Sequence, residues 1–323
     1  YMKAKRLIEV TMPVKEISAE SVRDKYIHHG HISTLHLWWA RRPLPVCRAV
    51  VFASLVPDPE DENCPTAFCE AVKSLLANKH DGAYYAPYKD IPYTAINDPM
   101  KDSLRNRLLC FIGKFSEEAS SKMIRNENVD RDCLSVRTLV RWESKNNSDV
   151  LKIARKLIWV AYNSDNNAEK TFDEMSNDFD EAYDSILKAE SELYECVNRH
   201  IHTQNVVELE QKLKKAIDVF QSKMPSIFDP FAGGGAIPLE AARLGCRSYG
   251  NDINPVAHII ERCSLEFPQR YGKPINYSKT EFEKLYGEKG VELLKERNYD
   301  FGDFVYIPNR LTFDVEYHAR LLL

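Results

Sequence analysis

The chain has 323 residues, which is long enough for about two domains with a sizeable core. Its content of 44% hydrophobic and 28% charged residues is ordinary for a globular protein. The formal net charge of −4 excludes a wholly basic nucleic-acid-binding protein.

No apolar run is long enough to span a bilayer, so we expect no membrane partner. Residues 1–10 lack the apolar stretch and the small-residue cleavage site of a secretory signal peptide. We therefore expect a cytoplasmic protein.

The charge is unevenly distributed along the chain. Residues 1–56 carry nine lysines and arginines against four acids, a net charge of +5, which leaves −9 for the remainder. Such a basic segment on an acidic body indicates either a local anionic partner such as a nucleic acid or a solvated basic face. Charge alone leaves both interpretations open.

The eight cysteines predict scattered reduced thiols rather than a metal site. None of them forms a C-x-x-C pair, and Cys64 and Cys69 are the closest together. Four histidines near the N-terminus also lack a metal-ligand spacing: His28, His29, His31 and His36. We predict no metal ligands.

The segment 1–59 is predicted to be helical. A helix is expected to begin near Ser18, and the HHGH stretch at 28–31 is expected to end it. A second helix is expected over Val46–Leu55, because Pro43 and Pro45 suit a first helical turn. The acidic, proline-containing stretch that follows, VPDPEDE, predicts a boundary.

Residues 60–224 are predicted to be a mainly helical insertion, since β signals are scarce there. Apolar residues recur with a period near 3.6 over Asp149–Tyr162, Glu181–His200 and Asn205–Ser222, which predicts three amphipathic helices. The polar, acidic stretch Asn163–Asp180 is expected to be a linker.

The pattern changes at residue 225, where alternating β and α signals begin. SIFD (226–229) and CRSYGND (246–252) predict strands that end in an acid. AIPLEAARLG (236–245) and NPVAHIIERCSLEF (254–267) predict the helices that follow them. A strand–turn–helix–strand–helix order is typical of the beginning of a parallel α/β sheet.

The glycine turn AGGG (232–235) indicates a ligand site, because ligands bind at the carboxyl ends of strands in such sheets. Asp229 precedes the turn, and Asp252 follows the second predicted strand, where a carboxylate suits ribose hydroxyls. The sequence does not match the dinucleotide fingerprint G-x-G-x-x-G, because Pro238 replaces its third glycine. It also lacks the lysine that follows the glycines in a phosphate loop. A phosphate-free nucleoside such as S-adenosylmethionine fits better. A turn that only permits tight packing is the alternative.

The stretches DPFAGGGAIPLEAARLG and NDINPVA resemble the cofactor motif of amino-group DNA methyltransferases. Four further stretches resemble one group of adenine-specific DNA methylases, which has an N-terminal domain of unknown function and a reported zinc ribbon. They are RLIEV (6–10), ISAESVRDK (17–25), GHISTLHLWWARRPLPVCRAVVFASLVPDP (30–59) and NRLTFDVEYHAR (309–320). The resemblance covers 1–59 and 225–323 well and 63–224 poorly.

The resemblance implies an α/β fold, namely the N-terminal portion of a Rossmann-like class I S-adenosylmethionine-dependent methyltransferase with a large helical insertion. It divides the chain into an N-terminal helical segment packing on the cofactor site (1–59), the insertion (60–224) and an incomplete first βαβα part of the cofactor-binding domain (225–323). Such enzymes methylate the amino group of adenine in DNA and commonly serve restriction-modification or phage defence.

The resemblance also implies the cofactor-binding residues. Asp229 would hold the methionine amino group and Asp252 the ribose hydroxyls, while Ile253 or Asn254 would border the adenine. The N-terminal segment would close over the methionine end, with Trp38 or Trp39 packed against the sheet edge and Arg41 or Arg42 reaching the cofactor carboxylate or a DNA phosphate. The alternative is that both tryptophans are core anchors and both arginines pair with surface acids. The implied set is Asp229, Pro230, Phe231, Ala232, Gly233, Gly234, Gly235, Asp252, Ile253, Asn254, Trp39, Arg41 and Arg42.

The catalytic tetrapeptide of this class, [Asp/Asn/Ser]-Pro-Pro-[Tyr/Phe/Trp], is missing, since the sequence has no two consecutive prolines. NDPM (97–100) is the nearest string and is expected to be a turn. We therefore predict no catalytic residues in this chain and expect an N-terminal portion of a larger methylase, completed downstream or by a partner subunit. DNA is the expected partner. An RNA methyltransferase and a non-catalytic cofactor-binding or scaffold subunit remain as alternatives.

Overall fold

The computed structural model describes residues 3–25, 42–76, 103–113, 138–166, 169–198, 203–300, 302 and 304–322. Contacts within the chain divide it into two compact units. Unit 1 comprises residues 1–180 and 221–258, and unit 2 comprises 181–220 and 259–323. The division predicted from the sequence, into 1–59, 60–224 and 225–323, has different boundaries and stays a prediction.

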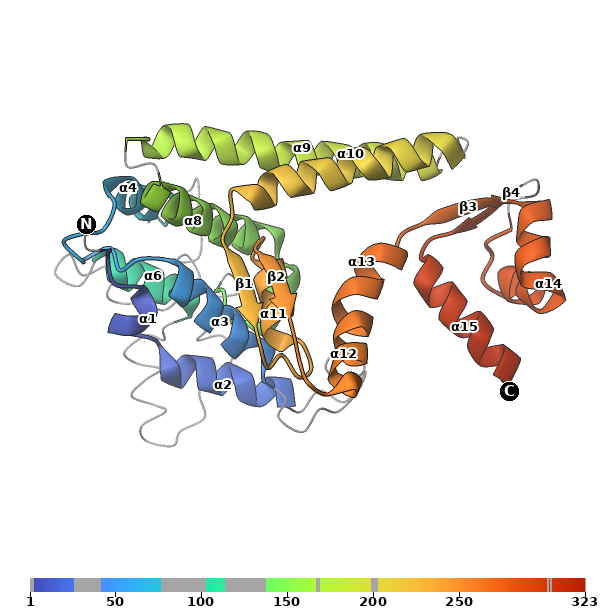
Figure 1. Ribbon diagram of the computed structural model, residues 1–323, viewed down its shortest axis with the longest axis horizontal. Helices are drawn as coiled ribbons and strands as arrows, with labels where there is room; N and C mark the ends of the chain where they lie inside the picture. The colour runs from blue at the N-terminus through green and yellow to red at the C-terminus, as the bar shows by residue number, and fades with distance from the viewer. Residues whose placement is uncertain are drawn as a thin grey trace, which may run out of the picture. The chain divides into compact units, whose positions relative to one another are not determined.

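Unit 1 is mainly helical, with one small parallel sheet (Figure 1). Helices α9 and α10 run from one unit into the other, and α12 begins in unit 1. In chain order, the elements that lie in unit 1 wholly or in part are α1 (Leu7–Val10), α2 (Val14–Lys25), α3 (Leu44–Leu55), α4 (Thr66–Leu75), α6 (Leu104–Ile112), the 3₁₀ helix η4 (Trp142–Asn146), α8 (Ser148–Asn166), α9 (Phe172–Asn198), α10 (Thr203–Ser222), β1 (Ser226–Asp229), α11 (Ala236–Arg243), β2 (Arg247–Gly250) and α12 (Pro255–Glu261).

Aromatic side chains form much of the core of unit 1. Phe52 of α3 meets Phe111 of α6 edge to face, with ring centroids 5.6 Å apart. Trp159 of α8 meets Phe179 of α9 in the same way, also at 5.6 Å. All four rings are buried, so α3, α6, α8 and the beginning of α9 share one apolar interior.

The strands β1 and β2 pair in parallel, with Ser226 opposite Arg247 and Asp229 opposite Gly250. Helix α11 connects them and packs against both strands, which makes a βαβ unit (Figure 1). The strands and helices predicted from residue 225 onward are confirmed at this local level. The described residues hold no further strand in this sheet, so the Rossmann-like fold remains a prediction.

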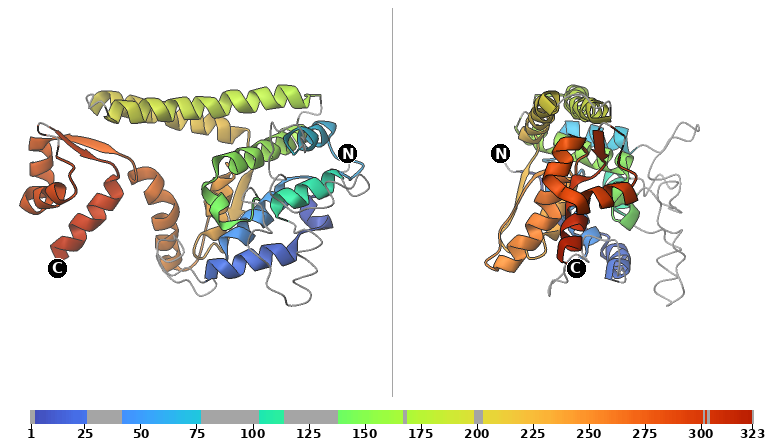
Figure 2. Two further views of the ribbon diagram at one scale, coloured as in Figure 1. Left: turned by 180° about the vertical axis from the view of Figure 1, so that it is seen from behind. Right: turned by 90° about the vertical axis from the view of Figure 1, so that its right-hand side faces the viewer.

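Unit 2 contains an antiparallel pair of strands with its own core. Phe282 stacks on Tyr286 there, and Phe313 meets both rings edge to face. The Tyr286 hydroxyl donates a 2.6 Å hydrogen bond to Asp314 Oδ1. Residues 181–198 of α9 and 203–220 of α10 also belong to unit 2 and lie side by side (Figure 2). Its other elements are η5 (a π-helical turn, Arg262–Glu266), α13 (Phe267–Tyr271), β3 (Ile275–Ser278), α14 (Lys279–Glu296), β4 (Phe304–Ile307) and α15 (Arg310–Leu322).

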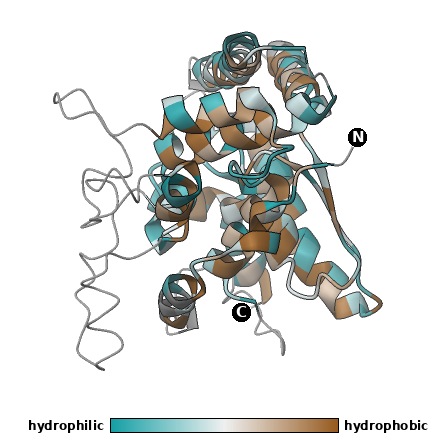
Figure 3. Ribbon diagram, turned by 90° about the vertical axis from the view of Figure 1, so that its left-hand side faces the viewer, coloured by the Kyte–Doolittle hydropathy of each residue, from teal (hydrophilic) through white to brown (hydrophobic). Residues whose placement is uncertain are grey.

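The amphipathic helices predicted in the insertion are confirmed. Within α9, Ala189, Leu193 and Val197 are buried, while Leu187 and Tyr194 are exposed. The hydropathy colouring shows the same mixture of hydrophobic and hydrophilic residues along the helices (Figure 3). The described residues between 60 and 224 include helices and no strand.

The predicted linker at 163–180 is wrong, because most of it is helical. Residues 163–166 complete α8, and α9 begins at Phe172. Met175 and Phe179, one turn apart on α9, are buried within unit 1. Burial of these two side chains outweighs the polar composition from which the linker was predicted.

Two predicted helix starts also need correction. Helix α2 begins at Val14 rather than near Ser18, and α3 begins at Leu44 rather than at Val46.

No described helix is long and apolar enough to cross a membrane.

We predict that Phe179→Ala lowers the free energy of unfolding of unit 1 by about 3–5 kcal/mol, since it leaves a cavity beside Trp159. All four tryptophans lie within residues 1–180, so tryptophan fluorescence during urea unfolding reports on this unit. Phe231→Ala is the matched control, because Phe231 is 85% exposed and contributes little packing. Equal effects of the two substitutions would contradict the packing described for α9.

Candidate functional site

The glycine turn between β1 and α11 requires glycine for a conformational reason. Gly233 has φ 55° and Gly235 has φ 75°, both in the left-handed region that side chains with a Cβ disfavour. Gly235 is also the residue before α11, where it accepts a 3.0 Å hydrogen bond from Leu239 N through its carbonyl. The turn therefore brings the backbone from β1 directly into the helix.

Backbone hydrogen bonds join this turn to the segment after β2. Asn251 N donates to Asp229 O at 2.9 Å, and Ala232 N donates to Asn251 O at 3.0 Å. These two bonds continue the parallel ladder past the ends of both strands. The glycine turn and residues 251–254 consequently form one structure at the carboxyl edge of the sheet.

The Asp252 carboxylate is fixed by both segments. Its Oδ2 accepts a 2.9 Å hydrogen bond from Gly233 N, and its Oδ1 accepts one of 2.9 Å from Asn254 N. Each carboxylate oxygen can accept a further hydrogen bond. Asp252 is only partly buried, so this oriented acceptor pair remains accessible to a ligand.

Asp229 lies at the end of the neighbouring strand. Its Oδ1 accepts a 3.0 Å hydrogen bond from Phe231 N, which turns the chain away from β1. Among the described residues, no hydrogen bond to its Oδ2 is found. Two carboxylates thus stand at adjacent strand ends, and each is oriented by a backbone N–H.

Large apolar side chains surround the turn and are exposed. Phe231 is 85% exposed and Ile253 is 97% exposed, two and three residues beyond the ends of β1 and β2. Phe228 and Tyr249, which are cross-strand partners and so lie side by side, are also exposed. Neighbouring exposed apolar side chains are typical of a place where another molecule binds.

A buried ion pair holds α11 in place behind the turn. Arg48 Nε of α3 lies 2.6 Å from Glu240 Oε2 of α11, and the two side chains are 1% and 0% exposed. Arg48 Nη1 also donates to the carbonyls of Leu139 and Arg141, at 2.8 and 3.2 Å. Arg243, one turn along α11, pairs with the other oxygen of Glu240.

This ion pair was not predicted from the sequence, although a signal exists. Arg48 and Glu240 are each the only charged residue in an apolar run, VCRAVVFASL and AIPLEAA. A charge in such a run is buried with the helix face and needs a partner. Which charge would be its partner could not be deduced, because the two residues are 192 positions apart.

The structure brings together ten of the thirteen predicted cofactor residues. They are Asp229, Pro230, Phe231, Ala232, Gly233, Gly234, Gly235, Asp252, Ile253 and Asn254. Trp39 and Arg41 lie outside the described residues, as do the histidines at 28–36 and the NDPM string. Arg42 is described and exposed, two residues before α3 begins. The described part of the chain contains no cluster of three or more potential metal ligands.

Comparison with known proteins gives one match. Residues 11–74 match the model of a protein family of unknown function, DUF1156. No curated protein and no solved structure matches the chain. The matched segment contains α2, α3 and α4, so it includes Arg48 and thereby contacts the helix that follows the glycine turn.

We predict that Arg48→Ala lowers the free energy of unfolding of unit 1 by about 3–5 kcal/mol, because it leaves the fully buried Glu240 with the partly exposed Arg243 alone and removes the donor to two backbone carbonyls. The measurement is urea unfolding followed by tryptophan fluorescence. The double variant Arg48→Met, Glu240→Leu removes both charges and should lose less stability than Arg48→Ala.

The control is Lys170→Ala, which breaks the exposed pair between Lys170 and Asp178 in the same unit. Surface ion pairs contribute little, so this variant should unfold at nearly the wild-type urea concentration. If Arg48→Ala behaved like Lys170→Ala, the ion pair would not be the anchor of α11.

Proposed function

We propose that the chain binds S-adenosylmethionine at the glycine turn and supplies the cofactor-binding part of a DNA adenine methyltransferase. The observation that carries the proposal is the Asp252 carboxylate, which Gly233 N and Asn254 N orient at the edge of a parallel strand pair. The resemblance of DPFAGGG and NDINP to the cofactor motif of amino-group methyltransferases supports the same assignment.

The residues present fit this cofactor in three respects. Asp252 offers two oriented acceptors for the ribose hydroxyls, and Asp229 offers a carboxylate oxygen for the amino group. Ile253 exposes an apolar surface of the kind that an adenine ring would cover. When bound, S-adenosylmethionine supplies an electrophilic methyl group.

The same site does not suit a phosphate-bearing cofactor. Asp229 and Asp252 both face the turn, and an anion there would be repelled by two carboxylates. The sequence also provides no lysine directly after the glycines, where a phosphate loop has one. A cofactor with a cationic amino end and no phosphate agrees with these charges.

The N-terminal segment has two proposed roles at this site. Arg48 of α3 supports it by pairing with Glu240, about one helical turn after the start of α11. Arg42, just before α3, is exposed and could contact a cofactor carboxylate or a DNA phosphate. We assign the same role to Arg41 and a covering role to Trp39, from the resemblance alone.

The missing Pro-Pro tetrapeptide limits the proposal to cofactor binding. In this class the tetrapeptide accepts hydrogen bonds from the target amine and stacks on the flipped base. A chain without it would need that motif from elsewhere before it could transfer a methyl group. Two alternative functions, a non-catalytic scaffold subunit and an RNA methyltransferase, must therefore be distinguished from a DNA methyltransferase by experiment.

We predict that Asp252→Ala weakens binding of S-adenosylmethionine at least tenfold, measured by titration calorimetry. The substitution removes the acceptors for the ribose and also two bonds that order the turn. Asp149→Ala, which removes an exposed acid at the start of α8, is the control and should bind normally. Unchanged affinity in Asp252→Ala would refute the assignment.

The variant Ile253→Ala distinguishes an effect on cofactor affinity from an effect on the free energy of unfolding. Ile253 is 97% exposed, so its truncation should leave the free energy of unfolding unchanged. If it borders the adenine, losing that contact costs about 1–2 kcal/mol, or roughly tenfold in affinity. Val10→Ala, an exposed valine in α1, should change neither quantity.

We further predict that the purified chain alone transfers no methyl group from labelled S-adenosylmethionine to duplex DNA or to tRNA. The physical reason is the absent tetrapeptide. With a partner polypeptide that carries the motif, label should appear in adenine of the duplex. Label in tRNA instead would favour the RNA enzyme, and unaided transfer would contradict the division of roles proposed here.

A further inference from the structure

Two cysteines lie together at the start of α4, far along the chain from the glycine turn. Cys64 belongs to the loop between α3 and α4, and Cys69 is the fourth residue of α4. Their Sγ atoms are 3.7 Å apart, within hydrogen-bonding distance for sulfur. Both side chains are partly exposed, so small molecules can reach them.

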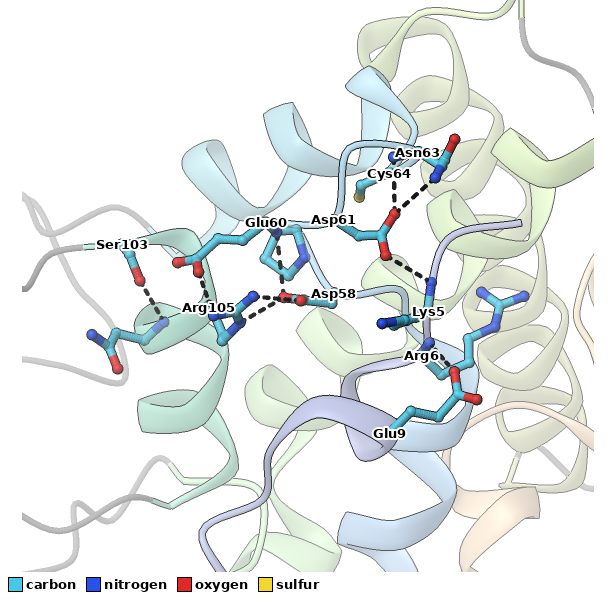
Figure 4. Close-up of polar contacts among 12 residues, drawn as sticks. Lys5, Arg6, Glu9, Asp58, Glu60, Asp61, Asn63, Cys64, Ser103 and Arg105 are labelled. Atoms are coloured by element: carbon cyan, nitrogen blue, oxygen red, sulfur yellow. Dashed lines mark hydrogen bonds and ion pairs between the residues drawn. The ribbon is translucent and has the colours of Figure 1, made fainter. Parts of the chain in front are cut away.

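The loop that carries Cys64 is held firmly by polar contacts (Figure 4). Asp58 binds Arg105 through two hydrogen bonds of 2.6 and 2.8 Å. Cys64 N donates to Asp61 O at 2.9 Å, and the Asp61 side chain accepts from Lys5 N and Asn63 N at 3.3 and 2.9 Å. Cys64 is therefore held opposite Cys69 by the surrounding structure.

The environment makes Cys69 the more acidic thiol of the two. The hydrogen bond between the two thiols lowers the pKa of Cys69 to about 7, and Lys73, one turn along α4, acts in the same direction. Burial and the charges of Glu70 and Asp58 oppose this shift. The same sulfur–sulfur contact, with burial and the nearby Asp58 and Asp61, raises the pKa of Cys64.

We propose that Cys64 and Cys69 form a peroxide-sensitive thiol pair that closes reversibly to a disulfide. A disulfide needs the sulfur atoms about 2.05 Å apart, so each has less than 1 Å to move. Cys69 attacks the oxidant, and Cys64 resolves the product.

The chemistry balances with hydrogen peroxide as the oxidant. The Cys69 thiolate attacks one peroxide oxygen, the O–O bond breaks, and the departing hydroxide takes up a proton to become water. Cys64 then loses its proton and attacks the sulfenic sulfur of Cys69, and the S–O bond breaks to release a second water. Two thiols lose two electrons, and one peroxide becomes two waters.

Peptide mapping after peroxide treatment tests the proposal. The full chain is treated with hydrogen peroxide, and free thiols are then blocked with N-ethylmaleimide. Cys64 and Cys69 occur in one tryptic peptide, 49–73. We expect this peptide to be lighter than the reduced one by two hydrogen atoms and to carry no maleimide. Cys263, also partly exposed, should remain a free thiol after peroxide and should therefore carry maleimide. Dithiothreitol should reverse the change.

Variants assign the two roles. In Cys64→Ala, dimedone should trap a sulfenic acid on Cys69, whereas Cys69→Ser should show no adduct on Cys64. Cys64→Ala also removes the hydrogen-bond partner of Cys69, so alkylation of Cys69 by iodoacetamide at pH 7 should slow by roughly tenfold as its pKa returns toward 8.5. Cys246→Ala is the control, since burial raises the pKa of Cys246 to about 12.

Maleimide on both cysteines after peroxide, or peroxide reacting with Cys263 in preference to Cys69, would overturn the proposal. Unchanged alkylation of Cys69 in Cys64→Ala would overturn the activation of Cys69 by its neighbour. These readouts follow sulfur chemistry, so they do not depend on methyl transfer or on cofactor binding.

Discussion

The buried ion pair between Arg48 and Glu240 is the constraint on which the rest of unit 1 depends. The Nε atom of Arg48, on α3, pairs with Glu240 on α11. Its Nη1 atom donates hydrogen bonds to the carbonyls of Leu139 and Arg141. Three segments that are distant in the sequence are thereby joined at one guanidinium. Since a buried charge without its partner is costly, these segments cannot separate without destabilising the unit.

This constraint bears directly on the glycine turn. Helix α11 begins immediately after Gly235, so fixing α11 also fixes the end of the turn. At its other end, the turn is tied to residues 251–254 through Ala232, Gly233 and the Asp252 carboxylate. A turn restrained at both ends presents its backbone and its two carboxylates in one arrangement, which is what a ligand site needs.

The sequence predicted the local elements of this site but not what anchors it. Asp229, the glycines and Asp252 were identified because strand ends, glycine turns and acids follow short-range rules. The pairing of Arg48 with Glu240 depends on tertiary packing, which no local pattern encodes. The linker predicted at 163–180 was wrong for a related reason, since Phe179 packs against Trp159 of the preceding helix, a tertiary contact that the polar composition does not reveal.

The central claim is that S-adenosylmethionine binds at the glycine turn, and photo-crosslinking tests it most directly. The intact chain is irradiated with labelled S-adenosylmethionine, with and without excess unlabelled S-adenosylhomocysteine, and the labelled peptide is sequenced. The account predicts label within residues 228–254, lost on competition. Label that lies elsewhere in the chain, or that the competitor does not reduce, would contradict it.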